Sequence, residues 1–375
     1  MGVLWDRFCC QRPLAKTSLS KITDCSRWTT DFGELSRAVH RPRRGLSAPT
    51  TNIVSTESDC VVASGQGHFS KYTGDCMVIS CCVGIMAYNE ETNIGPLLEA
   101  LLQQRLQLVD IAEIIVVASG CTDRTEAIVR DYCRKDGRVK LLVQRRREGK
   151  ASAINLLLWN TSQEVVVLES ADTLPRPDTI EALVSPFADP SVGMTGGRPV
   201  PTNDPASFMG FAAHLLWQLH HRVSLHKPKM GELIAFRRYF RQISHRSAVD
   251  EASIEPLIKG QGLRLLYVPE AVVLNKGPET VSDFFRQRRR IFAGHLYVKD
   301  TLGYKVSTLN GLPILLLFLQ EMKPTWRYLL WGPAVALLEC LARLLGAYDY
   351  MVKRKNPFVW PVAKSTKDIV QAATG

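Results

Sequence analysis

The sequence predicts an α/β fold in which helices flank a mostly parallel, Rossmann-like sheet. Strand-like apolar runs alternate with helical periods from residue 78 to residue 168, and repeated strand–helix units of this kind form parallel sheets. The run VVVL at 165–168 has no polar face, as expected of a strand that is buried on both sides. With 375 residues and 46% hydrophobic content, the chain can bury a substantial core.

Composition divides the chain into three regions. Residues 1–75 are rich in Ser, Thr, Arg and Gly and show no sustained apolar period, so we predict a disordered or targeting extension. A secretory signal is not expected, because no apolar segment follows the first residues. Residues 76–300 carry the strand–helix units, and residues 301–375 are predicted to form a helical, membrane-associated region.

Charge and cysteine usage narrow the classes of partner and compartment. Lys and Arg exceed Asp and Glu by 47 − 36 = 11, which favours an acidic partner such as a nucleotide phosphate or an anionic membrane face. Nucleic acid is not favoured, because the basic cluster at 37–44 is typical of a solvated charge run. The ten cysteines form no C-x-x-C pair, which argues against zinc or a disulfide framework and for reduced thiols in the cytosol.

The first strand–helix units carry polar loops after their strands. Predicted strands at 78–86 and 114–117 each precede a loop and a helix, and the segment VKLLVQRRREGKASAIN repeats the pattern. Right-handed crossovers place the loops after successive parallel strands at one edge of the sheet. That edge is expected to gather Asn89, Glu90, Asp123, Lys150 and Asp172.

Asp172 follows the buried strand at 165–168 within the run ESAD. The carboxyl end of such a strand lies at the rim where open α/β sheets bind ligands. A carboxylate there can hold a divalent cation, which would neutralise a diphosphate. The alternative is a polar strand end or the N-cap of a helix that Pro175 and Pro177 open.

Four motifs in this region, AYNEETNI, VVASGCTDRT, REGKASAIN and the SAD of VLESADTLP, resemble in order and spacing those of the family 2 glycosyltransferases. The resemblance covers roughly residues 78–295. It implies the GT-A nucleotide-sugar fold and transfer of a sugar from a nucleotide diphosphate donor with inversion at the anomeric carbon. The donor-binding residues that it implies are Ala87, Tyr88, Asn89, Glu90, Ser119, Asp123, Lys150 and Ala171.

These motifs also have a physical rationale. The first loop enters a helix, so its backbone N–H groups can meet a nucleotide while Tyr88 offers an aromatic face and Glu90 an acceptor. The REGK motif supplies a glycine for close backbone approach and the cation Lys150. The alternatives are an ordinary helix cap for the first loop and a solvated basic loop for residues 145–147, and we prefer the solvated loop for Arg145 and Arg146.

Two departures from the family pattern concern the donor. Ala118 and Ser119 stand where the family usually has acidic residues that help to hold the base, so the base is open, with UDP as the default. Ser170 replaces the first carboxylate of the family's Asp-x-Asp metal motif. Asp172 would then hold Mg²⁺ or Mn²⁺ as the one protein carboxylate, together with the diphosphate and water.

The second half of the domain is expected to face the acceptor. A helix over 205–226 contains four histidines, predicted to form a polar helix face rather than a metal site because two of them are adjacent. The segment MGELIAFRRYF resembles the family's short acceptor-side strand, which would put Gly231 and Glu232 near the acceptor.

An acidic pair, Asp250 and Glu251, opens the next predicted helix and resembles the family's Glu-Asp or Asp-Asp pair. Inverting transfer needs a carboxylate that removes the proton of the acceptor hydroxyl. Both residues are candidates for this base, with a slight preference for Asp250. The alternative is negative charge that only stabilises a helix N-terminus.

The run QRRRI stands where many membrane-bound members of the family have Gln-x-x-Arg-Trp. Gln287 and Arg290 share a helix face, and a guanidinium beside the leaving diphosphate would stabilise the transition state. Ile291 replaces the Trp, which argues against processive polymer synthesis. A basic surface helix on acidic lipid is the alternative, and it fits Arg286 and Arg288.

Two apolar segments near the C-terminus bear on location. The segment at 309–319 is too short to span a bilayer, whereas 328–347 has about the ~20 residues required. Glu339 and Arg343 interrupt the longer segment one turn apart and could pair. We therefore expect in-plane or hairpin association with the cytoplasmic leaflet first, a single span second, and a soluble helical subdomain third.

Together these features predict a membrane-associated inverting glycosyltransferase whose active site faces the cytoplasm. It would move a sugar from a UDP-sugar to an acceptor hydroxyl on a glycan or a lipid-linked molecule. Two alternatives remain: a sugar-phosphate nucleotidyltransferase, and a catalytically degenerate scaffold, which Ala118, Ser170 and Ile291 suggest.

Overall fold

The structure, a computed structural model, describes residues 78–245, 249–309 and 311–353. All of them lie in one unit, Ser70–Gly375. The extension predicted over 1–75 is outside the described residues. The predicted division at residue 300 falls near the end of helix α7 (Val281–Leu302) and remains a prediction.

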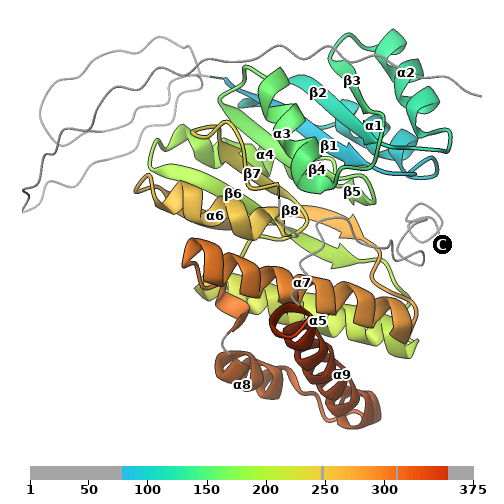
Figure 1. The fold of residues 1–375 in the computed structure, drawn as a ribbon, viewed down its shortest axis with the longest axis vertical. Coiled ribbons are helices and arrows are strands. Elements are labelled where there is room, and N and C mark those ends of the chain that lie inside the picture. Colours follow the sequence, from blue (N-terminus) through green and yellow to red (C-terminus); the bar gives the residue numbers. More distant parts are fainter. Residues whose placement is uncertain (1–77, 246–248, 310, 354–375) are drawn as a thin grey trace, which may run out of the picture. The chain divides into compact units, whose positions relative to one another are not determined.

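An eight-stranded sheet forms the centre of this unit, with strand order β3-β2-β1-β4-β7-β6-β8-β5 (Figure 1). The strands are β1 (Ile79–Ala87), β2 (Val109–Ser119), β3 (Val139–Gln144), β4 (Val165–Ser170), β5 (Thr173–Pro175), β6 (Val192–Pro201), β7 (Ile234–Arg237) and β8 (Arg264–Asn275). Strands β1 to β4 pair in parallel, as do β6 and β8. The mostly parallel α/β sheet is therefore confirmed, with β7 and β5 as its antiparallel members.

Helices cover both faces of the sheet because side chains alternate along each strand. The helices are α1 (Ile94–Leu102), α2 (Thr125–Lys135), α3 (Lys150–Asn160), α4 (Thr179–Val184), α5 (Phe208–His226), α6 (Asp250–Lys259), α7, α8 (Gly311–Glu321) and α9 (Trp326–Met351), with short 3₁₀ turns η1 (Ser185–Ala188) and η2 (Ser307–Leu309). One apolar core joins α1, α2 and α4 to the sheet, and a second joins α3 and α6 to the other face. Along β1, Cys81 and Val83 enter the first core and Cys82 the second.

Three strands depart from a regular parallel sheet. Strand β4 is fully buried but pairs in parallel with β1 only, since its other neighbour, β7, is antiparallel. Strand β6 continues through the Gly/Pro-rich segment after residue 195. Strand β8 runs through Pro269, and its pairing with β6 shifts register there, because proline cannot donate to the ladder.

Helices α5, α7, α8 and α9 complete the unit (Figure 1): α9 packs on α7 and α5, α8 packs on α5, and one apolar cluster joins α5, α7 and α9 through Met209, Phe284 and Ala342. Thr280 caps α7 by accepting a hydrogen bond from the Asp283 backbone N–H. Helix α9 is tied to α7 by ion pairs of Arg288 with Glu339 and of Arg289 with Asp349. Charged side chains as well as apolar ones therefore hold the C-terminal helices to the rest of the unit.

Candidate active site

A cavity of about 570 Å³ opens at the carboxyl ends of the first strands and continues between α5, α7, α8 and α9. Most of the residues predicted to act in the site line it. They are Ala87, Tyr88, Glu90, Ser119, Lys150, Asp172, Asp250, Glu251, Gln287 and Arg290. The crossovers of a parallel sheet bring the strand-end loops to this edge, and α6 and α7 add the residues from the second half of the chain.

Three residues predicted to bind the donor are absent from the lining of this cavity. Asn89, in the left-handed region at φ 53°, accepts a hydrogen bond from the Thr122 backbone N–H at 2.8 Å and donates to its hydroxyl at 3.0 Å. Asp123 accepts hydrogen bonds from the N–H and hydroxyl of Thr125, as a helix cap does. Ala171 is 3% exposed in the apolar core. Asn89 and Asp123 thus brace the loops around the site.

A cation–π pair, Arg147 with Tyr88, lines the part of the cavity where the donor is expected to bind. The Arg147 guanidinium lies over the Tyr88 ring at 4.1 Å from its centroid, which holds the loop after β3 against the loop after β1. Gly120 makes this approach possible, since a Cβ there would lie 2.5 Å from the Arg147 backbone nitrogen. Arg145 and Arg146 are exposed, as predicted for a solvated basic loop.

Lys150 connects the donor side of the cavity to the acidic pair. Its ammonium lies 2.8 Å from the Asp250 carboxylate, which joins the first residues of α3 and α6. Desolvation disfavours the ammonium, but the charges of Asp250 and Glu251 outweigh it and raise the pKa of Lys150. Desolvation and then the charge of Asp250 raise the pKa of Glu251. One carboxylate of the pair is therefore engaged by a cation, while the other is the stronger base.

A second pair of carboxylates, Asp172 and Glu232, faces the same cavity. Burial raises the pKa of Glu232, and the charge of Asp172 raises it further. Two carboxylates that line one cavity suit a hard divalent cation, which prefers oxygen ligands. Among the described residues no three His, Cys, Asp or Glu side chains form a ready metal cluster, so a cation here would complete its shell with phosphate and water.

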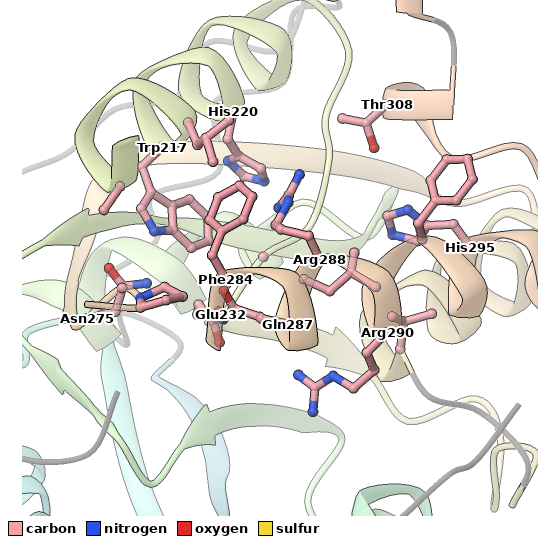
Figure 2. Close-up of a pocket in the computed structure, with 18 of the residues that line it drawn as sticks. Trp217, His220, Glu232, Asn275, Phe284, Gln287, Arg288, Arg290, His295 and Thr308 are labelled. Atoms are coloured by element: carbon pink, nitrogen blue, oxygen red, sulfur yellow. The ribbon is translucent and has the colours of Figure 1, made fainter. Parts of the chain in front are cut away.

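Helix α7 contributes Gln287 and Arg290 to the same cavity as Asp172 and Glu232. Figure 2 shows Gln287 near Glu232, and Arg290 pointing away from Arg288. The Nε atom of Arg290 is buried and, within the described residues, has no hydrogen-bond partner. An unpaired buried guanidinium N–H is costly, so this atom is suited to an anionic ligand.

Several residues lining the cavity were not predicted to act in the site. They are Arg147, Lys229, His220, Arg288 and His295. The expectation of a polar helix face is wrong for His220, which is 8% exposed against Trp217 and Tyr267. Arg147 lies in the REGK motif and Arg288 in the QRRRI run, whereas no local sequence pattern marks His220 and His295, because their positions depend on how α5 and α7 pack. The sequence did indicate Glu232, because its segment resembles the family's acceptor-side strand.

Comparison with solved structures identifies the class of fold. The chain superposes on a mannosyltransferase from Pyrobaculum calidifontis, solved with GDP-Man and Mn²⁺, with a TM-score of 0.54 and 22% identity. The superposition covers 77% of this chain and 92% of that one. At this identity the likeness establishes the fold, a GT-A-like α/β sheet.

Residues 82–251 match the family described as Glycosyl transferase family 2. A dolichyl-phosphate beta-glucosyltransferase of Trichomonas vaginalis is 33% identical over 104 residues, which are 26% of this chain and 31% of the relative. A beta-monoglucosyldiacylglycerol synthase of Synechocystis sp. is 30% identical over 142 residues, which are 36% of this chain and 29% of the relative. The chain thus spans less than a third of each of these relatives.

Proposed function

We propose that this chain is an inverting glycosyltransferase that moves a sugar from a nucleotide diphosphate sugar to an acceptor hydroxyl at a membrane face. One observation carries the proposal: a single cavity is lined by Asp172, by Lys150 and by the Asp250–Glu251 pair. The match of residues 82–251 to the family 2 model supports the reaction class. We propose a UDP-sugar as the donor from the family resemblance. GDP-sugars are the first alternative donors to test, because the fold neighbour was solved with GDP-Man.

The proposed donor site uses the strand-end loops. Tyr88 and Arg147 would flank the nucleotide, while Lys150 and Arg290 would neutralise phosphate oxygens. We assign Mg²⁺ or Mn²⁺ to Asp172 with Glu232 beside it, and the bound cation would neutralise charge on the diphosphate. Asn89 and Asp123 would act indirectly by fixing these loops.

The proposed transfer is a single displacement. The acceptor oxygen forms a bond to the anomeric carbon as the bond from that carbon to the diphosphate oxygen breaks. The hydroxyl proton passes to a carboxylate of the acidic pair, and Gln287 with Arg290 stabilises the departing diphosphate. We assign the base to Glu251, because Asp250 is engaged by Lys150 at 2.8 Å.

Asp172→Ala tests the metal assignment. We expect metal-dependent donor turnover to fall by about 100-fold or more, because a lost metal ligand removes several kcal/mol of charge stabilisation. The measurement is nucleotide release from UDP- and GDP-sugars with Mn²⁺ and with a chelator. Asp131→Ala, at an exposed carboxylate on α2, is the matched control. Undiminished turnover by Asp172→Ala would show that the assignment is wrong.

The same assay separates the two rival functions. A sugar-phosphate nucleotidyltransferase would consume a nucleoside triphosphate and a sugar phosphate, and would leave nucleotide sugars unchanged in the forward direction. A degenerate scaffold would turn over neither kind of donor and would show no metal-dependent binding of nucleotide by calorimetry.

We further propose that α8 and α9 place the enzyme in the plane of the cytoplasmic leaflet. Among the described residues α9 is the one helix long and apolar enough to cross a bilayer. However, Glu339 of α9 pairs with Arg288 of α7 and with Arg343, and Asp349 pairs with Arg289. These ion pairs support an in-plane arrangement, because a spanning helix would have to leave α7.

A further inference from the structure

The cavity has a second compartment beyond the proposed donor site, between α5, α7, α8 and α9. Its polar lining consists of His220, Lys229, Arg288, His295, Glu339 and Arg343, and we call it the basic compartment. In Figure 2 the Arg288 side chain extends toward His220, whereas Arg290 points the other way. The two arginines of α7 thus reach different parts of the cavity, and Arg290 is the one assigned to the donor diphosphate.

The charges of this compartment do not balance. Glu339 is the single carboxylate of the set, and it accepts hydrogen bonds from Arg288 and Arg343. Lys229 forms no salt bridge with any residue in the described part of the chain. Glu251, Glu255 and Glu232 act on Lys229 without forming a salt bridge with it, and Glu251 and Glu232 line the same cavity. Within the basic compartment as defined, three cations face one carboxylate, so the Lys229 ammonium is available to an anionic ligand.

His220 supplies an independent sign of a ligand. His220 is more than nine-tenths buried, and neither ring nitrogen forms a hydrogen bond of good geometry within the described residues, although the Met230 backbone acts on the ring. Burial, followed by the charge of Lys229, lowers its pKa, so the ring is neutral and one nitrogen donates. Buried polar atoms without partners are uncommon because they lose hydration without compensation. An acceptor oxygen in the basic compartment would satisfy both this N–H and the Lys229 ammonium.

The walls around these polar groups are apolar. Leu219 of α5, Phe318 of α8 and Val335 of α9 line the same cavity, and α8 has no buried residue of its own. Leu315 lines the cavity yet is 50% exposed, so the apolar wall continues to the outer surface of α8. A ligand here needs an anionic head and an apolar chain.

We propose that the basic compartment binds the phosphate of a phospholipid acceptor, with Lys229 and His220 on the phosphate oxygens and the acyl chains along α5, α8 and α9. This inference rests on the proposed glycosyltransferase function and names its acceptor class. The reacting hydroxyl belongs to the head group beyond the phosphate and extends toward the acidic pair of α6. Transfer to that hydroxyl leaves the phosphate unchanged.

Acceptor kinetics test the proposal on the full chain. The acceptors are phosphatidylglycerol, which has phosphate, hydroxyl and chains; diacylglycerol, which lacks the phosphate; and glycerol phosphate, which lacks the chains. We expect phosphatidylglycerol to have a KM about tenfold to a hundredfold below that of diacylglycerol, as hydrogen bonds to a charged group predict. Glycerol phosphate should be weaker than phosphatidylglycerol, because it buries no apolar surface.

Lys229→Met should abolish the preference for phosphatidylglycerol, and Lys229→Arg should restore part of it. Lys323→Met, at a basic residue between α8 and α9 that does not line the cavity, is the control for general attraction to an anionic surface. Equal KM values for phosphatidylglycerol and diacylglycerol, or an intact preference in Lys229→Met, would overturn the proposal. If the KM for glycerol phosphate equals that for phosphatidylglycerol, the proposal that acyl chains bind along α5, α8 and α9 is overturned.

Hydrolysis of the donor by the wild-type chain without acceptor distinguishes failure of the acceptor inference from failure of the proposed function. If donor hydrolysis is present but no phosphate preference exists, the acceptor inference fails while the proposed function stands. If neither donor hydrolysis nor transfer occurs with any nucleotide sugar, the proposed function itself fails.

Discussion

At the scale of single residues, Lys150 makes the two carboxylates of the acidic pair, Asp250 and Glu251, unequal as candidate bases. Lys150 holds Asp250 at 2.8 Å, whereas the pKa of Glu251 is raised by desolvation and by the charge of Asp250. A base acts in its deprotonated form, so a raised pKa moves the acid-side loss of activity above the range of an ordinary glutamate. We therefore propose different roles for the two acids although they are adjacent in sequence.

Glu251→Gln and Asp250→Asn separate these roles. We expect Glu251→Gln to lower kcat by about 100-fold or more, because general base catalysis contributes at least that much. Asp250→Asn should remain active. Its kcat/KM should begin to fall on the acid side at a lower pH than in the wild type, because the negative charge that raises the Glu251 pKa is gone. The measurement is kcat/KM against pH. The reverse result, an inactive Asp250→Asn and an active Glu251→Gln, would move the base to Asp250.

The stacked pair of Arg147 and Tyr88 gives a prediction for donor affinity. Arg147→Ala should raise the donor Kd by roughly 2- to 30-fold, because a cation–π contact contributes about 0.5–2 kcal/mol. Titration calorimetry with the nucleotide diphosphate measures the change. Arg146→Ala, at the exposed neighbour, is expected to leave Kd unchanged. Equal effects of the two substitutions would indicate that charge alone, rather than stacking, matters.

At the scale of elements, the contact of α9 with α7 depends on charged side chains. Burial alone would raise the pKa of Glu339, but the charges and hydrogen bonds of Arg288 and Arg343 lower it to about 2. A carboxyl whose folded pKa lies below its ordinary value stabilises the fold above that ordinary value. This stabilisation is lost as the pH falls toward 2.

Glu339→Ala should lower the free energy of unfolding by about 3 kcal/mol at neutral pH, because two partly buried guanidinium groups lose their partner. Asp131→Ala, which breaks an exposed pair on α2, should cost less than about 1 kcal/mol. Urea denaturation at pH 7 and near pH 3 measures both. The effect of Glu339→Ala should shrink at the lower pH, and a pH-independent effect would argue against the ion pair as its source.

At the scale of the whole molecule, exposed leucines gather on the two C-terminal helices. They are Leu312, Leu315, Leu316, Leu319, Leu329, Leu330, Leu337, Leu341, Leu344 and Leu345. Lys323 and Arg327 lie near Tyr328 and Trp326 in the same region, with cations over aromatic rings. An apolar face with basic and aromatic residues at its end is suited to an anionic bilayer surface.

Leu312, Leu316 and Leu319 of α8 are exposed and do not line the cavity. Their combined replacement by Gln should abolish flotation of the protein with anionic liposomes, because about 1.5–3 kcal/mol of burial is lost for each leucine. Leu225→Gln on α5 is the matched control at another exposed leucine. Flotation of the triple variant at the wild-type level would contradict the in-plane proposal, and retention of the wild-type chain after alkaline carbonate washing would favour a spanning α9.

Much of this architecture follows from local pattern. The strand–helix units, the position of Asp172 after β4 and the acidic pair at the start of α6 were all predicted and are all present. Each depends on the period of apolar residues and on turn residues within a few positions. The pairing of Glu339 with Arg343 was also predictable, because one helical turn separates them.

The sequence by itself thus determined the fold class and the edge of the sheet where the site lies, since both depend on order and periodicity along the chain. Only the tertiary structure decided the contact of Lys150 with Asp250, the docking of α9 through Arg288 and the burial of His220. Each of these depends on packing between segments that are far apart in sequence, and local patterns carry no information about such contacts.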